Sequence, residues 1–231
     1  MKKWTALFLS LILILSMTAC GKTTESSVAG KVEPAEEATE AAETPVSMGR
    51  LEGGTYINEY TGYACDLDSN WAFYTAEELQ ELPENVQEIL ADTEIGDNME
   101  GIPQFTDMMA ENVEKLVTVN VMYTKVGMQE RLVYAVMSDE QIIEEVLKQK
   151  DSMIEAYAQA GMDVESMEKV TINFLGQERT AMKTVSNVDG VTQYTLQVFD
   201  YHLGRYSVTL TATSFVEDNT QWVMDQFYPV N

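Results

Sequence analysis

The residue pattern nearest to a functional motif is a short acidic loop in the N-terminal third of the chain. Asp66, Asp68 and Asn70 place oxygen atoms at positions 1, 3 and 5 of a loop, and Glu77 stands at position 12. A hard cation such as Ca²⁺ binds carboxylates at this spacing, with a bidentate acid last. Position 6 holds Trp71 instead of the glycine that the turn needs, and we expect Trp71 to be a core residue. The four oxygen-bearing residues are candidate calcium ligands in a chain with 38 acids, where a chance match is expected.

A thiol–imidazole pair is the second arrangement to consider, and apart from Cys20 only Cys65 and His202 offer one. Such catalysis needs the two side chains within hydrogen-bond reach. Nothing in their spacing brings them together, and Cys65 lies in an alternating stretch that favours a buried small hydrophobe. The chain has no Gly-rich phosphate loop, no serine nucleophile motif and no zinc-ligand spacing. We therefore predict no catalytic residue and no cofactor.

Residues 1–19 have the features of an export signal. Two lysines open the segment, an apolar run follows over residues 7–17, and small residues precede Cys20. The run is shorter than the about 20 residues of a transmembrane helix. Residues 17–20, Met-Thr-Ala-Cys, resemble the lipobox of bacterial lipoproteins, which implies cleavage before Cys20 and a diacylglyceryl group with palmitate on that cysteine. We expect anchoring by lipid at the extracytoplasmic face of the cell membrane. An ordinary cleaved signal is the alternative.

Residues 20–49 contain the lipidated cysteine and an acidic tether. The tether consists mostly of Ala, Glu, Thr, Ser and Pro and has no aromatic residue, so it buries too little apolar surface to fold. The chain as a whole carries a formal net charge of −24, which repels phosphate backbones. We expect no nucleic-acid partner. The expected partners are the membrane, through the lipid on Cys20, and a cell-surface or envelope component that the sequence does not specify.

Residues 50–231 are long enough for a single domain with a sizeable core. Strands are predicted around Gly62, over residues 55–60 and 62–68. A further strand is predicted over residues 116–126, where valines alternate with polar residues and indicate one buried face. A capping box, Thr75 to Glu78, predicts a short helix before Pro83, and apolar residues after that proline suggest more helix: Val86, Ile89 and Leu90.

The C-terminal half predicts one long helix followed by a series of strands. Ser138 is the expected N-cap of the helix and Gly161 its end. Alternating strands joined by tight turns follow, with turn signals at Gly176, Asp189-Gly190 and Gly204. A last short helix begins near Asn219. The predicted fold class is α+β, a twisted antiparallel β-sheet flanked by helices.

Two stretches resemble a family of small, uncharacterised lipoproteins from Clostridia-type Firmicutes. The first is GTYINEYTGY at residues 54–63, followed by Trp71 and by Phe-Tyr-Thr-Ala-Glu-Glu at residues 73–78. The second joins residues 107–110 to residues 119–121. The opening is also distantly similar to PsbP-like domains, which implies an antiparallel sheet sandwiched by helices. The resemblance implies a non-catalytic accessory or binding module and offers no functional residues.

These observations favour a lipid-anchored extracytoplasmic binding or accessory module without catalytic activity. Two alternatives remain open at this point. The many acids allow a hydrolase that works with a pair of carboxylates about 5 to 9 Å apart, and the acidic loop allows a calcium-binding surface domain. Met108 and Met109 invite a ligand groove, although core packing explains them better.

Overall fold

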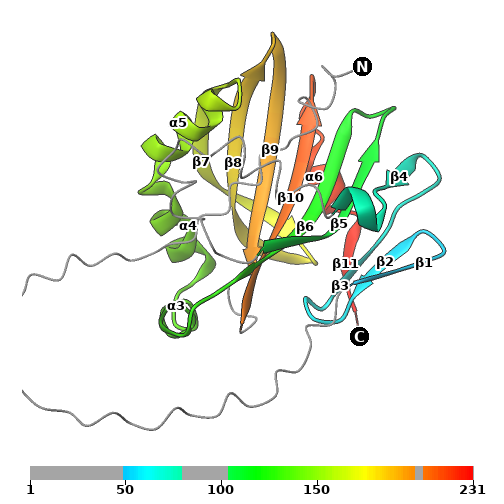
Figure 1. Ribbon diagram of the computed structural model, residues 1–231, viewed down its shortest axis with the longest axis horizontal. Helices are drawn as coiled ribbons and strands as arrows, with labels where there is room; N and C mark the ends of the chain where they lie inside the picture. The colour runs from blue at the N-terminus through cyan, green and yellow to red at the C-terminus, as the bar shows by residue number, and fades with distance from the viewer. Residues whose placement is uncertain (1–48, 80–103, 201–204, 231) are drawn as a thin grey trace, which may run out of the picture.

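The computed structural model describes residues 49–79, 104–200 and 205–230. Its strands form two antiparallel sheets, a seven-stranded one in the order β4-β5-β6-β10-β9-β8-β7 and a four-stranded one in the order β1-β2-β3-β11 (Figure 1). Helices pack on the larger sheet, so the predicted α+β class is confirmed. We refer to the two as the large sheet and the small sheet.

The C-terminal half of the large sheet is a run of consecutive hairpins, as the turn residues predict. Asp189 and Gly190 join β8 to β9 with φ angles of 51° and 84°, both in the left-handed region that this two-residue turn requires. Leu175 and Gly176 make the equivalent turn between β7 and β8. The four strands are β7 (Met162–Phe174), β8 (Gln177–Val188), β9 (Val191–Asp200) and β10 (Tyr206–Phe215).

The N-terminal half of the large sheet adds three strands: β4 (Trp71–Phe73), β5 (Gln104–Asn112) and β6 (Val117–Lys125). β6 lies at the centre of the sheet, between β5 and β10. It matches the strand predicted over residues 116–126, but the expectation of one buried face is wrong. Every residue of β6 except Lys125 is buried, because both faces of this central strand are covered.

The predicted long helix is divided into α4 (Asp139–Leu147) and α5 (Lys150–Gln159). Ser138 is the N-cap, and its side chain accepts from the backbone of Gln141 as predicted. The division lies at Lys148 and Gln149, whose amides bond three residues back instead of four and so tighten the last turn of α4. A further helix that the sequence did not predict, α3 (Met128–Tyr134), precedes them.

The small sheet contains the two strands predicted around Gly62, namely β2 (Thr55–Asn58) and β3 (Tyr63–Asp66). Two short strands complete it: β1 (Arg50–Glu52) at its edge and β11 (Phe227–Pro229) beside β3. The helix predicted after Thr75 begins as expected, since the Glu78 amide donates to the Thr75 hydroxyl and Glu78 accepts from the Thr75 amide.

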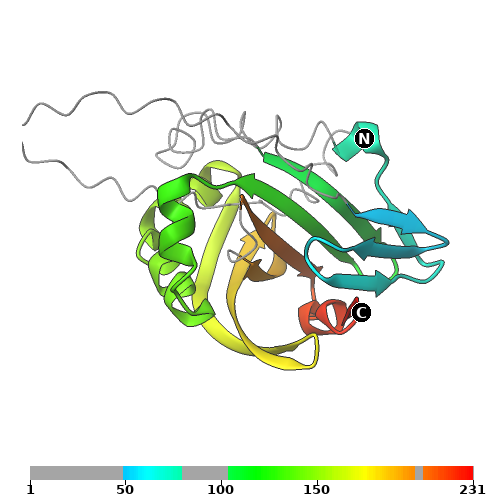
Figure 2. The same ribbon diagram turned by 90° about the horizontal axis from the view of Figure 1, so that it is seen from below.

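The elements form three layers with a hydrophobic core on each side of the large sheet (Figure 2). One core lies between the large sheet, the small sheet and α6 (Thr220–Met224), which begins where the sequence predicted a helix. The other core lies between α4, α5 and the face of β7 and β8. The two ends of the large sheet are therefore supported by different partners on opposite faces.

Several predictions concern residues outside the described ones. They include the signal at residues 1–19, Cys20, the tether up to residue 48, the helical residues Val86, Ile89 and Leu90, and His202. Among the described residues, no helix is long and apolar enough to cross a membrane.

Candidate functional site

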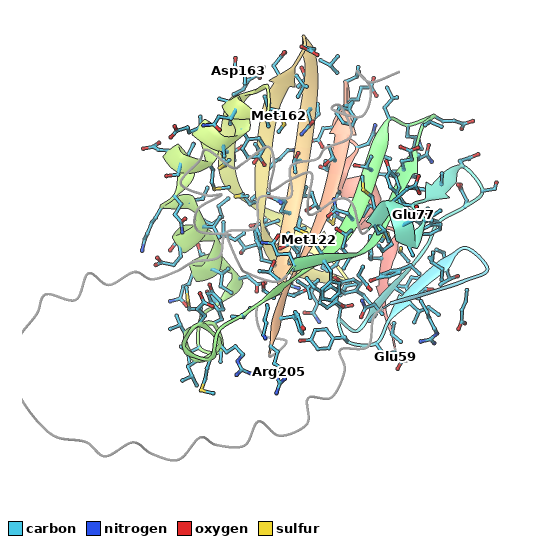
Figure 3. The ribbon with its side chains drawn as sticks, in the orientation of Figure 1. Glu59, Glu77, Met122, Met162, Asp163 and Arg205 are labelled. Carbon is cyan, nitrogen blue, oxygen red and sulfur yellow. The ribbon has the colours of Figure 1, made fainter. Side chains whose placement is uncertain are left out.

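The structure does not gather the four candidate calcium ligands. Asp66 ends β3, where its carboxylate accepts from the Thr55 hydroxyl at 2.6 Å and from the Tyr228 hydroxyl at 3.2 Å. Asp68 accepts from the backbone amide of Asn70 at 2.9 Å, which closes a local turn. Glu77 is exposed on the helical turn labelled in Figure 3. Among the described residues, no three His, Cys, Asp or Glu side chains are arranged to hold a metal ion.

Trp71 is a core residue, as predicted. Its side chain is 8 % exposed and stacks on Trp222 with ring centroids 5.9 Å apart. Position 6 of the acidic loop therefore begins strand β4 instead of forming the sharp turn of a calcium loop.

Cys65 is a buried free thiol in the small sheet, as predicted. Burial raises its pKa to about 12, and the nearby Asp66 carboxylate adds to the increase. A thiol with so high a pKa is protonated at neutral pH, which makes it a poor nucleophile.

The acidic side chains are mostly held by basic partners. Arg179, on β8, donates to Asp139 at 2.6 Å and to Asp200 at 2.9 Å, and so ties α4 to the large sheet. Hydrogen bonds from Lys169 lower the pKa of Glu140, and those from Thr75 lower the pKa of Glu78. A carboxyl group that acts as a general acid needs the opposite shift.

A hydrogen-bonded cluster joins the small sheet to the large one at Asn58, Tyr56, Tyr123 and Asp107. The Asn58 amide nitrogen lies 2.7 Å from the Tyr56 hydroxyl, 2.7 Å from the Tyr123 hydroxyl and 2.8 Å from an Asp107 carboxylate oxygen. The Tyr56 hydroxyl donates to Asp107 at 2.5 Å. The backbone amide of Gly49 donates to the same carboxylate. We call these five residues the junction cluster.

The junction cluster is almost fully enclosed and internally satisfied. Asn58 and Tyr123 are 0 % exposed and Tyr56 is 1 % exposed. Burial raises the pKa of Tyr56, and the Asp107 carboxylate raises it further, so this phenol stays a donor. A Cβ added to Gly49 would lie 2.2 Å from the Tyr56 ring, so only glycine fits here. The cluster is explained by its role in holding the two sheets together.

The opposite face of the large sheet has a different character at its centre. The strand registers place side chains of the central strands in rows, one of which contains Asn120, Thr211 and Gln197. A neighbouring row contains Thr118, Thr213, Thr195 and Thr184. We define the polar face as these rows together with Thr106, Thr124 and Thr209, which lie on the same side of the sheet.

Many atoms of the polar face are buried without a hydrogen-bond partner. Asn120 is 0 % exposed, and neither its amide nitrogen nor its amide oxygen has one. The polar face is at most 7 % exposed at any residue. Such an atom costs on the order of 1 to 3 kcal/mol relative to a satisfied one. The other unpartnered side-chain oxygens of this face belong to Thr106, Thr118, Thr124, Thr184, Gln197 and Thr213.

Apolar residues adjoin the polar face on the same side of the sheet. Met122, labelled in Figure 3, lies beside it on β6, and Phe199 and Met182 connect it to the core beneath α4 and α5. The Tyr157 hydroxyl of α5 is also buried and unpartnered. Burial raises the pKa of Tyr157, and the Thr184 hydroxyl, which lies near it, lowers that pKa in part. The arrangement suits the recognition of polar groups by neutral donors and acceptors.

Sequence reasoning missed the polar face because its residues alternate with valines and leucines, as on a solvent-facing side. One signal was available. The polar positions of β6 before Lys125 are Thr118, Asn120 and Thr124, all uncharged, in a chain with 38 acidic and 14 basic residues. A solvated face of such a chain is expected to carry charges. Met108 and Met109 point to opposite faces and are both buried, and Met108 is part of the core, as predicted.

Comparisons with known proteins identify a distant structural similarity. The chain is similar to cyanobacterial PsbP (CyanoP) from Synechocystis sp. PCC 6803, with 11 % sequence identity and a TM-score of 0.43 over 82 % of this chain and 98 % of that one. No family model and no curated protein matches the sequence. The resemblance to Firmicutes lipoproteins therefore stays a prediction, and the similarity to PsbP says nothing of a shared ligand or partner.

Proposed function

We propose that the protein is a lipid-anchored extracytoplasmic binding module that does not catalyse a reaction and that holds its ligand on the polar face. The observation that carries the proposal is Asn120, whose amide is fully buried and lacks any hydrogen-bond partner. Buried polar atoms are normally paired, and groups that are not paired usually meet a water molecule, an ion or a ligand. The polar face concentrates such atoms on adjacent strands, which a purely structural role does not require.

The anchor in this proposal is a lipid on Cys20, at the end of the export signal. Two or more acyl chains suffice for stable attachment to a membrane. The tether then runs to Gly49, whose backbone amide is fixed by Asp107 in the junction cluster. A pull on the tether would therefore be transmitted to a satisfied and enclosed part of the domain, far along the sheet sequence from Asn120.

Mass spectrometry of the mature protein tests the anchoring. We expect residues 1–19 to be absent and Cys20 to carry a diacylglyceryl group. The Cys20→Ala variant should leave the membrane fraction while keeping the folded domain. An intact N-terminus without acylation, or a membrane fraction unchanged by Cys20→Ala, would contradict lipid anchoring.

Thermal unfolding tests binding without knowledge of the ligand. A ligand that binds only the folded state adds RT ln(1 + [L]/Kd) to stability, about 2.7 kcal/mol at a hundredfold excess over Kd. The series should include millimolar Ca²⁺, cell-envelope glycans and peptides. We expect stabilisation by one class of ligand that is lost in the Asn120→Leu variant. Stabilisation by Ca²⁺ alone, lost on substitution of Asp66 or Asp68, would favour the calcium-binding alternative instead.

A further inference from the structure

We infer that the ligand of the polar face is an uncharged, hydroxyl-rich molecule of the saccharide class. The inference rests on the proposed function, because it assumes that this face holds a ligand. It goes further by naming the chemistry that the face selects. Three properties of the face carry it: its lack of charge, its mixture of donors and acceptors, and its position in the middle of the sheet.

The polar face as defined contains only Thr, Asn and Gln side chains. The charged side chains that the structure describes nearby are already engaged elsewhere. Lys169 of β7 binds Glu140 and Glu144 on α4, and Arg179 binds two aspartates. A charged ligand on this face would lose its hydration without gaining a counter-charge, which is unfavourable. The face therefore selects against anions and cations.

An apolar ligand is disfavoured for a different reason. It would leave the amide of Asn120 and the hydroxyls of Thr118 and Thr213 as unpaired as they are without it. Each such group keeps its full desolvation penalty unless a polar atom reaches it. The unpartnered atoms comprise an amide donor, amide acceptors and hydroxyls that both donate and accept. Sugar hydroxyls, which also donate and accept, match this mixture.

The position of the face distinguishes a saccharide from a peptide. Extended peptides commonly bind by adding a strand to a free sheet edge, through backbone hydrogen bonds. The polar face lies mainly on β6, β10 and β9, and each of these strands is already paired on both sides. A ligand there meets side chains only and gains nothing from a peptide backbone in register with the sheet.

Isothermal titration of the full-length lipoprotein tests the inference, in a detergent whose headgroup carries no sugar. The probes are maltotetraose and tetra-N-acetylchitotetraose as neutral saccharides, tetragalacturonate as a charged saccharide of equal length, and laurate as an apolar ligand. We expect saturable binding of a neutral tetrasaccharide and none of tetragalacturonate or laurate at the same concentrations.

Two substitutions locate the binding to the polar face. Asn120→Leu keeps the size of the side chain and removes both amide atoms, so affinity for the neutral saccharide should fall about tenfold or more. Thr213→Val removes one hydroxyl and should weaken binding less. Thr171→Val, on the exposed side of β7, should leave affinity unchanged. Unfolding midpoints of all variants confirm that each is folded.

The outcomes separate the inference from the proposed function. Binding of tetragalacturonate or laurate that depends on Asn120 would overturn the saccharide class and leave the binding module standing. Failure of both neutral saccharides to bind would overturn the inference, while the Cys20 experiment and the thermal series still decide on the proposed function. Equal affinity of wild type and Asn120→Leu for a neutral saccharide would place its site elsewhere and also overturn the inference.

Discussion

Two asparagines on opposite faces of the same fold show what distinguishes a structural polar cluster from a candidate binding face. Asn58 and Asn120 are both 0 % exposed. The amide nitrogen of Asn58 lies within hydrogen-bond distance of two tyrosines and a carboxylate, and its amide oxygen accepts from the backbone amides of Tyr60 and Thr61. Asn120 has no partner for either amide atom. Residue type and burial are equal, and only the partners differ.

The difference separates two uses of a buried amide. In the junction cluster every bond of Asn58 contributes to the contact between the sheets, so the residue is explained by stability. On the polar face Asn120 costs stability, and a residue that destabilises the free protein is better explained by function. Natural proteins keep such groups where activity needs them. The comparison therefore predicts substitutions of opposite sign at the two positions.

The largest expected effect is that of Asn58→Leu. It leaves the hydroxyls of Tyr56 and Tyr123 and the Asp107 carboxylate without their shared donor, so we expect the free energy of unfolding to fall by about 3 kcal/mol or more. Urea denaturation measures the change. Asn173→Leu, at an exposed position of β7, serves as the control and should stay within about 0.5 kcal/mol of wild type. A loss below 1 kcal/mol for Asn58→Leu would contradict the structural role of the cluster.

The second prediction concerns the pH dependence of the interior beside the junction cluster. Below pH 9.0 the Cys65 thiol is protonated in both the folded and the unfolded state. As pH rises from 9.0 to about 12, it ionises only in the unfolded chain, because burial keeps the folded pKa near 12. Stability should therefore fall by up to about 1.4 kcal/mol per pH unit from this group.

Urea denaturation of wild type and Cys65→Ala between pH 8 and pH 11 isolates this contribution. The tyrosines titrate in both proteins, so the difference in slope above pH 9 reports on Cys65 alone. We expect the variant to lose stability more slowly with rising pH. Parallel curves would show that the thiol is not enclosed in the folded protein.

The smallest effect is expected for Thr213→Val on the polar face. The change removes a buried hydroxyl that has no partner and keeps the shape of the side chain, so the free energy of unfolding should rise by up to about 1 kcal/mol. Thr171→Val is the matched control, and its exposed hydroxyl should make no measurable difference. A loss of stability for Thr213→Val beyond that of the control would show that its hydroxyl is satisfied in the free protein.

Much of the fold was predictable because local chemistry and tertiary structure agree. Ser138 and Thr75 make the hydrogen bonds that their capping boxes predict, and Asp189-Gly190 forms the predicted hairpin turn. Strand β5 escaped prediction because it contains an irregularity between Thr106 and Met108, which breaks the alternation of apolar residues. The division of the long helix at Gln149 has no strong local signal such as proline or glycine.

The candidate site was not predictable from periodicity. Alternation on β6 correctly placed Val119 and Val121 in a core, but it gave Asn120 to solvent. Burial of the second face depends on what covers the sheet, which is a tertiary property. Only the absence of charge at the intervening positions, set against the composition of the whole chain, distinguishes this face in the sequence.

The most direct test of the account is the free energy of unfolding of Asn120→Leu in the absence of ligand, measured by urea denaturation beside wild type and Asn58→Leu. The account predicts that Asn120→Leu is more stable than wild type, opposite in sign to Asn58→Leu, because it replaces two unpaired buried atoms with an apolar group of similar shape. A loss of stability comparable to that of Asn58→Leu would show that Asn120 is held by the folded protein itself, and it would contradict the polar face as a binding site.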